Sequence, residues 1–336
     1  MRTGILAAGN FIIDYVKIID AWPEQDMLSS IRSETSSNGG GPYNVLKDLA
    51  AMGASYPLEA CGLVGDDANG AWIQQDCAKA GINTRQLHHT ANAPTSYTDA
   101  MTVASTGRRT FFHQRGANAH FNETHVNFAD TNAKHFHLGY LMLLDAMDSF
   151  VSGGRTRASL ALEAAKNAGL TTSVDIVSTE NPQFREIAES ALPYTDVLII
   201  NEIEAGKVAG MTLKNGDTVD VEGCVTAARA LLDRGVLQQV VIHFVEGGVV
   251  VSKDGTVTKQ TSLKVPSGFI VGATGAGDAF AAGYLHGWHE QWDVSRCLKT
   301  AVCTAAACLT HATPSLGLRS VEECLNLGEA YGYRSL

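Results

Sequence analysis

Three glycines and one carboxylate stand close together in the segment GATGAGDAF, residues 272–280. The segment follows the apolar residues FIV and precedes an alanine-rich stretch with the composition of a helix. Glycines let successive backbone N–H groups turn toward an anion, and the start of a helix adds a partial positive charge. We therefore expect Gly275, Ala276 and Gly277 to form an anion hole that suits phosphoryl oxygens.

Asp278 falls in the first turn of this expected helix, where a carboxylate is electrostatically favoured. It has two interpretations, a helix-capping acid after a glycine turn or a base that accepts the proton of a hydroxyl group. The second is attractive because phosphoryl transfer to an alcohol requires donors for the phosphoryl group beside such a base. An aspartate with an ordinary pKa of about 3.9 is ionised at neutral pH, so no special tuning is expected.

Short apolar runs alternate with amphipathic segments of helical length along the chain. The runs that indicate buried strands are residues 5–9, 58–65, 171–176, 197–201 and 240–244. The segments with helical spacing are residues 45–53, 70–81, 157–169 and 226–235. This alternation predicts an α/β fold, in which helices cover both faces of a parallel sheet.

Two stretches, residues 11–38 and 95–114, alternate instead like half-exposed strands. They are consistent with a small second sheet attached to the main one, or with a pair of edge hairpins. Both stretches contain apolar residues that a separate partner would have to cover: Ile12, Ile13, Val16, Ile18, Tyr97, Met101, Val103, Phe111 and Phe112.

The composition excludes some classes of partner. The chain of 336 residues has 25 basic and 35 acidic side chains, for a net charge of −10, without a long run of either sign. Nucleic-acid and anionic-membrane surfaces need a clustered positive field, so neither partner is expected. Seven scattered cysteines without CxxC spacing indicate buried thiols in a reducing compartment. Because no segment approaches membrane-spanning length, we expect a cytoplasmic protein.

The motifs, taken together, resemble those of the ribokinase-like (PfkB) sugar kinases. GATGAGD is similar to the carboxyl-terminal signature of that family. Four further segments resemble family motifs in the right order, namely GGGPYNV at 39–45, GLVGDDANG at 62–70, RGANA at 115–119 and NEIE at 201–204. The resemblance covers nearly the whole chain, and five motifs in order are far more specific than any one of them.

The resemblance implies a three-layer α/β/α core with a mostly parallel central sheet and a small β-sheet lid. The core would comprise residues 1–10, 39–94 and 115–336, and the lid residues 11–38 and 95–114. The implied reaction is phosphorylation of a hydroxyl group of a sugar or sugar derivative by ATP with Mg²⁺. A nucleoside kinase and a non-catalytic binding protein that retains the kinase fold are the alternatives. Relatives often pair their lids, which implies a homodimer through the lid.

The resemblance also assigns roles to single residues. Asp278 becomes the catalytic base, and Gly275, Ala276 and Gly277 the anion hole. The implied substrate-binding residues are Asp14, Gly40, Asn44, Arg115 and Asn118. The implied nucleotide-binding residues are Asn201, His243, Gly248 and Thr274, and Glu204 is implied to hold Mg²⁺ through water.

Several of these residues also have a purely structural interpretation. Asp14 and Glu204 fit exposed acids, and Asn44 is a favoured residue type for a helix N-cap. Arg115 suits a carboxylate or phosphate on the substrate, or a surface acid of the protein itself. His243 fits either a donor to a phosphate oxygen or a core histidine.

The sequence departs from the family pattern at two places. Gly272 stands where the family has an aspartate in a loop that often supports a monovalent cation, so similar rates are predicted in potassium and sodium buffers. The nucleotide stretch TLGxxG appears here as HFVEGG, residues 243–248. Val245 replaces a glycine there, and its β-branched bulk predicts altered contacts and low affinity for ATP.

Overall fold

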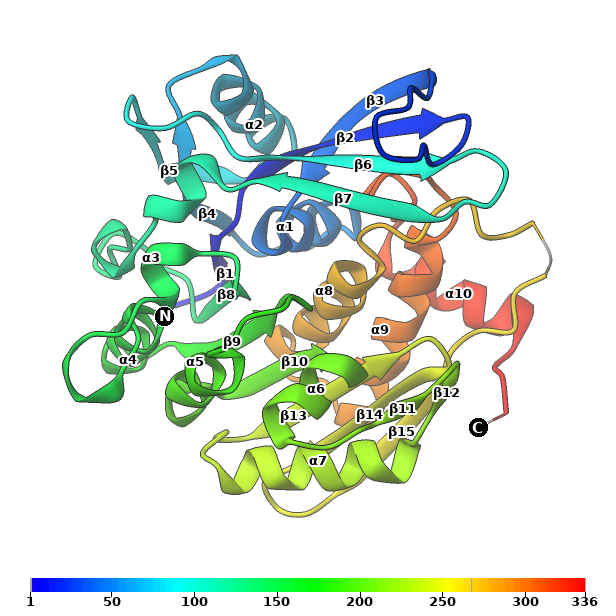
Figure 1. Ribbon diagram of the computed structural model, residues 1–336. Helices are drawn as coiled ribbons and strands as arrows, with labels where there is room; N and C mark the ends of the chain where they lie inside the picture. The colour runs from blue at the N-terminus through cyan, green and yellow to red at the C-terminus, as the bar shows by residue number, and fades with distance from the viewer. Residues whose placement is uncertain (1, 267, 336) are drawn as a thin grey trace.

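A nine-stranded sheet forms the middle layer of the protein in the computed structural model, which describes residues 2–266 and 268–335 (Figure 1). The strand order is β15-β14-β13-β10-β9-β8-β1-β4-β5. The pairs from β5 across to β13 are parallel, whereas β14 and β15 are added in antiparallel orientation. The strands are β1 (Ile5–Gly9), β4 (Leu58–Gly65), β5 (Asn83–Thr90), β8 (His135–Leu141), β9 (Thr171–Ile176), β10 (Val197–Asn201), β13 (Gln239–Phe244), β14 (Gly247–Ser252) and β15 (Val257–Thr261).

Helices cover both faces of this sheet and bury a hydrophobic core on each. In β1, Leu6 and Ala8 pack into one core, and Ile5 and Ala7 pack into the other. This alternation is the period of two that a strand imposes on its side chains. One layer contains α4 (Arg157–Asn167), α5 (Phe184–Ala191), α6 (Glu202–Ala209) and α7 (Val221–Asp233), after the short α3 (Asp145–Asp148). The other contains α1 (Gly41–Ala51), α2 (Ala68–Lys79), α8 (Ala276–His289), α9 (Val294–Cys308) and α10 (Val321–Tyr331).

The three-layer architecture predicted from the sequence is therefore confirmed. The five predicted apolar runs form β1, β4, β9, β10 and β13, and the four predicted helices contribute to α1, α2, α4 and α7. β8 was not predicted, because His135 and His137 interrupt its apolar pattern. Both histidines are buried. Hydroxyl groups of Thr171 and Ser173 on the neighbouring β9 bond to both ring nitrogens of His135 and to Nδ1 of His137, at 2.7–2.8 Å.

A separate four-stranded sheet lies beside the main body (Figure 1). Its strands are β2 (Ile12–Ile19), β3 (Ile31–Gly39), β6 (Tyr97–Val103) and β7 (Arg109–Gln114), in the order β3-β2-β6-β7. We call this sheet the lid. Its strands come from the two stretches that were expected to form either a second sheet or edge hairpins. The prediction of a second sheet is therefore correct. A short hairpin, β11 (Lys214–Asn215) and β12 (Thr218–Val219), completes the strands.

All seven cysteines are buried and free, so no disulfide links the layers. No helix in the described part of the chain combines the length and apolar character that a membrane crossing requires.

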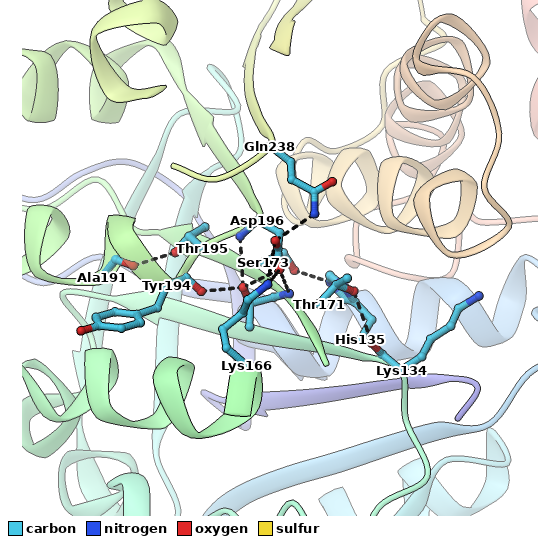
Figure 2. A network of polar contacts seen from close by, with 11 residues as sticks. Lys134, His135, Lys166, Thr171, Ser173, Ala191, Tyr194, Thr195, Asp196 and Gln238 are labelled. Atoms are coloured by element: carbon cyan, nitrogen blue, oxygen red, sulfur yellow. Dashed lines mark hydrogen bonds and ion pairs between the residues drawn. The ribbon is translucent and has the colours of Figure 1, made fainter. Parts of the chain in front are cut away.

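A buried polar network lies where β9, β10 and β13 begin (Figure 2). The Asp196 carboxylate, only 2% exposed, accepts hydrogen bonds from the ammonium group of Lys166 at 2.6 and 2.8 Å. It also accepts from the backbone N–H of Thr172 at 2.8 Å and from the Gln238 amide at 2.9 Å. Because this edge is opposite to the carboxyl ends of the parallel strands, the network stabilises the sheet without reaching those ends.

We expect Asp196→Ala to lower the free energy of unfolding by about 3 kcal/mol, because it leaves the buried donors without an acceptor. Urea unfolding measures this change. The matched control is Glu329→Ala, which breaks an ion pair with Lys299 in which the glutamate side chain is 72% exposed. Its effect should stay below about 1 kcal/mol. An equal effect of the two substitutions would contradict the structural role of Asp196.

Candidate active site

The glycine turn leads into α8, whose first residue is Ala276. Gly275 is the N-cap of this helix and has a φ of 80°, which is in the left-handed region that favours glycine. A Cβ atom at this position would lie 2.5 Å from the Cβ of Pro314. A larger residue is therefore excluded both by conformation and by space. In the first turn of a helix the N–H groups have no partner within the helix, so this turn can bind an anion.

Asp278 lies in that first turn with its side chain buried. The Asn44 amide donates to its Oδ2 at 2.7 Å, and the Tyr140 hydroxyl donates to its Oδ1 at 2.5 Å. Burial raises the pKa of Asp278 to about 6, although both hydrogen bonds oppose this shift. The expectation of an untuned carboxylate is therefore wrong. Both carboxylate oxygens bond to side chains of other elements, which holds the Asp278 carboxylate in a fixed orientation.

Asn44 orients this carboxylate. It lies inside α1, whose N-cap is Gly40, so the capping interpretation of Asn44 is wrong. The Asn38 amide donates to Asn44 Oδ1 at 2.7 Å, which leaves the Asn44 NH₂ group to face Asp278. Asn44 therefore contacts Asp278 directly, and its predicted contact with the substrate stays a prediction.

Three successive glycines allow close approach at the end of β3. A Cβ atom on Gly39 would lie 2.4 Å from the carboxyl carbon of Asp14. Gly40 has a φ of 90°, and a Cβ atom on Gly41 would lie 2.8 Å from the ring of Tyr140. The GGG segment therefore brings the acid of the lid and the tyrosine of β8 to the start of α1.

Asp14 is a buried acid of β2 in the lid. Burial raises its pKa to about 7, and repulsion from Asp278 adds to the effect. The interpretation of Asp14 as a solvated loop acid is therefore wrong. Asn118 is also fully buried, and its Oδ1 has no hydrogen-bond partner among the described residues. A carboxyl group and a free amide oxygen are suitable acceptors for hydroxyl groups of a ligand.

Arg115 follows the lid and does not have a free guanidinium group. It forms an ion pair with Asp145 at 2.5 Å and donates to the carbonyl oxygen of Met142. Of the two interpretations of Arg115, this geometry matches the pairing with an acid of the protein.

A cavity of about 410 Å³ opens beside Asp278. Asp175, Glu204 and Asp278 line it together with the glycine turn. Glu204 is only 3% exposed, and it accepts hydrogen bonds from Ser178 and Asn201 at 2.8 Å. Burial raises the pKa of Glu204 to about 7, so its interpretation as an exposed acid is wrong.

The carboxylates of this cavity suit a hydrated cation. Burial and the neighbouring Glu204 raise the pKa of Asp175. Among the described residues, no basic side chain forms an ion pair with Asp175 or Glu204. The described residues include no group of three or more His, Cys, Asp or Glu that is able to hold a metal ion alone. Magnesium keeps several waters and needs only one or two carboxylates, so Asp175 and Glu204 fit this ion.

A second cavity of about 390 Å³ continues from the first. Asn201 and His243 line both cavities, and the second is lined mainly by apolar residues, among them Val245, Ile270, Phe280, Val302 and Leu309. Such a cavity suits a flat, weakly polar group, with a charged group in the first cavity. Gly248 lines neither cavity, because it is buried and faces Phe280, whereas the neighbouring Gly247 does line the second.

His243 is a neutral histidine at the junction of these cavities. Burial lowers its pKa to about 4, and its ring lies 5.0 Å from that of Phe280. Its N–H group is able to donate a hydrogen bond, but the ring carries no charge to attract a phosphate.

The comparisons with known proteins agree with this arrangement. The pfkB family carbohydrate kinase model matches residues 3–320. The chain belongs to this family. The resemblance inferred from the five motifs is thereby confirmed.

Similar proteins include both sugar and nucleoside kinases. The chain is 28% identical to the ATP-dependent ribose-1-phosphate kinase of Halopiger xanaduensis, over 88% of each sequence. It is also 28% identical to the adenosine kinase of Saccharomyces cerevisiae, over 82% of this chain and 79% of the relative. Arabidopsis thaliana ribokinase, solved with ribose and ATP, has a similar fold, with a TM-score of 0.80 at 22% identity over 97% and 99% of the two chains.

Four residues at the site were missed by the motif analysis. Tyr140 and Asp175 lie at the carboxyl ends of β8 and β9, which is where α/β sheets bind ligands. Asp175 is the acidic residue near the end of the predicted strand TTSVDI, and this position could have indicated a site residue. Phe111 lines the cavity of Asp278, and Arg109 donates to the hydroxyl of Thr274. Nothing in the local sequence around Phe111 or Arg109 indicates that these lid residues lie at the site.

Gly272 has no room for the aspartate of the family pattern. A Cβ atom there would lie 2.7 Å from the carbonyl oxygen of His311 and 2.8 Å from the Cα of Ala312. We therefore expect the same turnover in potassium and sodium buffers of equal ionic strength. Strong and specific stimulation by potassium would show that other groups supply a cation site.

Proposed function

We propose that this protein transfers the γ-phosphoryl group of ATP to a hydroxyl group of a sugar or sugar derivative. The observation that carries the proposal is the geometry of Asp278. Its buried carboxylate stands beside the glycine turn of α8, fixed by Asn44 and Tyr140. A base next to an anion-binding turn is the arrangement that phosphoryl transfer to an alcohol needs.

Asp278 accepts the proton of the acceptor hydroxyl as its oxygen attacks the γ-phosphorus. The new O–P bond forms, the bond between the γ-phosphorus and the bridging oxygen breaks, and ADP leaves. A pKa of about 6 makes Asp278 a stronger base than an ordinary aspartate, yet leaves it mostly ionised at pH 7. The turn at Gly275 to Gly277 stabilises the charge on the transferred group with N–H groups that are fixed before the reaction.

The two joined cavities provide a place for each part of the nucleotide. The apolar cavity receives the base, and the cavity with the carboxylates receives the phosphates. Asp175 and Glu204 hold Mg²⁺ through water, and His243 donates to a phosphate oxygen between the cavities. When bound, the metal ion neutralises negative charge on the phosphates.

Asp14 and Asn118 bind hydroxyl groups of the acceptor. Both are buried acceptors at the junction of the lid and the main body. A polyhydroxylated ring satisfies several such groups at once, which supports a sugar as the acceptor. The intact base argues against a non-catalytic binding protein.

The test is an ADP-release assay with purified protein, Mg²⁺ and ATP against sugars, sugar phosphates and nucleosides. We expect acceptor-dependent ADP release with at least one sugar or sugar phosphate, above the rate without acceptor. Release only with nucleosides would assign the alternative substrate class. Binding of ATP and an acceptor without release under any condition would contradict a kinase.

We also propose that two lids pair in a homodimer. The expectation that Ile12, Ile13 and Val16 need an outside partner is wrong, because they are buried within the chain. Other lid residues do expose large apolar side chains. Trp22 and Phe112 are about half exposed and stack on each other at 6.0 Å. Neighbouring exposed apolar side chains are a common feature of interaction surfaces, so these two rings favour a contact between lids.

Light scattering tests this assembly. The wild type should have twice the chain mass of 35.7 kDa, and Trp22→Glu with Phe112→Glu should give a monomer. Leu237→Glu, at an exposed apolar residue just before β13, is the control and should remain dimeric. A wild-type monomer at micromolar concentration would refute the dimer.

A further inference from the structure

Arg109 connects the lid to the glycine turn. It is the first residue of β7, and its guanidinium group donates a hydrogen bond to the Thr274 hydroxyl, 165 residues away. Alternate residues of a strand share one face, so Arg109 and Phe111 point the same way. Phe111 lines the cavity that contains Asp278. The strand therefore presents the arginine on the face that carries the site.

The charge of Arg109 has no ion-pair partner in the described part of the chain. Two other cations of the lid, Lys17 and Arg32, do have such partners, in Asp99 and Asp20. Arg109 is half-buried, so its guanidinium group has lost part of its water without gaining a carboxylate. An arginine remains charged under these conditions. A group in this state is suited to bind an anion that arrives from solution.

The adjacent cavity lacks positive charge of its own. Its titratable lining consists of Asp175, Glu204, Asp278, the neutral His243 and Tyr140. A triphosphate that enters it meets three acids, and a metal ion offsets only part of this repulsion. Because Thr274 immediately precedes the anion-binding turn, Arg109 is the basic side chain seen to reach that turn.

We propose that Arg109 binds the γ-phosphoryl oxygens of the nucleotide at the entrance of the anion hole. This inference rests on the proposed kinase function and extends it to the lid. The guanidinium fork exchanges the Thr274 hydroxyl for phosphoryl oxygens, which it is able to bind in a bidentate manner. Arg109 gains and loses no proton in the reaction, since the hydroxyl proton goes to Asp278 and ADP leaves as before. The lid strand thereby supplies one side chain of the nucleotide site.

A phosphate group carried by the acceptor has the same chemistry as the γ-phosphate. The position of Thr274 favours the nucleotide, because this residue belongs to the turn that receives the transferred group. The experiment therefore needs one arm that varies the nucleotide and another that varies the acceptor.

The test compares Arg109→Gln with Arg108→Gln. Arg108 is the adjacent, exposed arginine that directly precedes β7, and it serves as the control. Calorimetry measures the binding of ADP and of the non-hydrolysable analogue AMP-PNP, both with Mg²⁺. We expect Arg109→Gln to weaken AMP-PNP binding by about tenfold or more, as for a lost hydrogen bond to a charged group, with ADP binding unchanged. The value of kcat should fall by about 10²–10³-fold, and Arg109→Lys should restore part of both losses.

Three other results would overturn the proposal. If Arg109→Gln weakened the binding of ADP and of AMP-PNP equally, or weakened the binding of neither, Arg109 would not contact the γ-phosphate. A raised KM for phosphorylated acceptors alone would assign Arg109 to the acceptor. Wild-type protein that binds neither nucleotide would refute the kinase function itself, which separates that failure from failure at Arg109. The thermal midpoint of each variant shows whether the fold is retained.

Discussion

Asp278→Asn should lower kcat by about 10²–10⁴-fold, which is the usual contribution of a positioned general base. Asparagine has nearly the same shape, but it is unable to accept the proton of the attacking hydroxyl. The fold and ligand binding should persist, because the anion-binding turn is made of backbone groups. Steady-state kinetics gives kcat, and calorimetry with AMP-PNP gives the nucleotide affinity.

The control for this variant is Asp233→Asn, at an exposed aspartate where α7 ends. It should leave kcat unchanged. A variant at Asp278 that retains more than about a tenth of the wild-type kcat would remove Asp278 from the role of base, since this loss is smaller than a general base supplies.

The pH dependence of kcat/KM should report the state of the same carboxylate. The value should fall at acidic pH, with a midpoint between about 6, the raised pKa of Asp278, and about 7, that of Asp14. Because the two acids repel each other, the acidic limb of the pH profile reports the titration of the pair rather than of one residue. Tyr140→Phe removes a hydrogen bond that favours the ionised form of Asp278. The pKa should therefore rise, and the acid limb should move to higher pH by about one unit.

Tyr15→Phe is the control for the tyrosine variant. The Tyr15 hydroxyl bonds to Asn69 and not to the base, so its loss should leave the acid limb in place. A limb that stays in place or moves to lower pH in Tyr140→Phe would show that the tyrosine does not stabilise the charged base. This readout distinguishes a positioning role from a loss of packing, which would change kcat/KM at every pH.

The parts of the fold that the sequence predicts are those with continuous apolar runs. Strands such as β10 are buried on both faces, and their composition shows this directly. β8 was missed because its two histidines look polar in the sequence. Burial lowers the pKa of both histidines, and hydroxyl groups of β9 bond to their rings. Pairing between strands cannot be seen in a local sequence pattern.

At the site, too, the sequence shows what lies within one segment but not the contacts between distant segments. The glycine turn and Asp278 lie in one segment, so the spacing alone suggested an anion hole beside a cap or a base, and the family resemblance then implied the base. Asn44 was recognised as a site residue, but its bond to Asp278 was not foreseen, because the two residues are 234 positions apart. The raised pKa of Asp278 likewise depends on burial, which only the tertiary structure determines. Nothing in the local sequence marks Tyr140 or Arg109.

The most direct test of the central claim is ³¹P NMR of a reaction that contains ATP, Mg²⁺ and the best acceptor of the panel. The account predicts that wild-type protein produces ADP and one phosphate monoester of the acceptor in equal amounts. It also predicts that Asp278→Asn produces neither in the same time. Release of inorganic phosphate without an ester, or equal ester formation by the variant, would contradict transfer to an acceptor hydroxyl with Asp278 as the base.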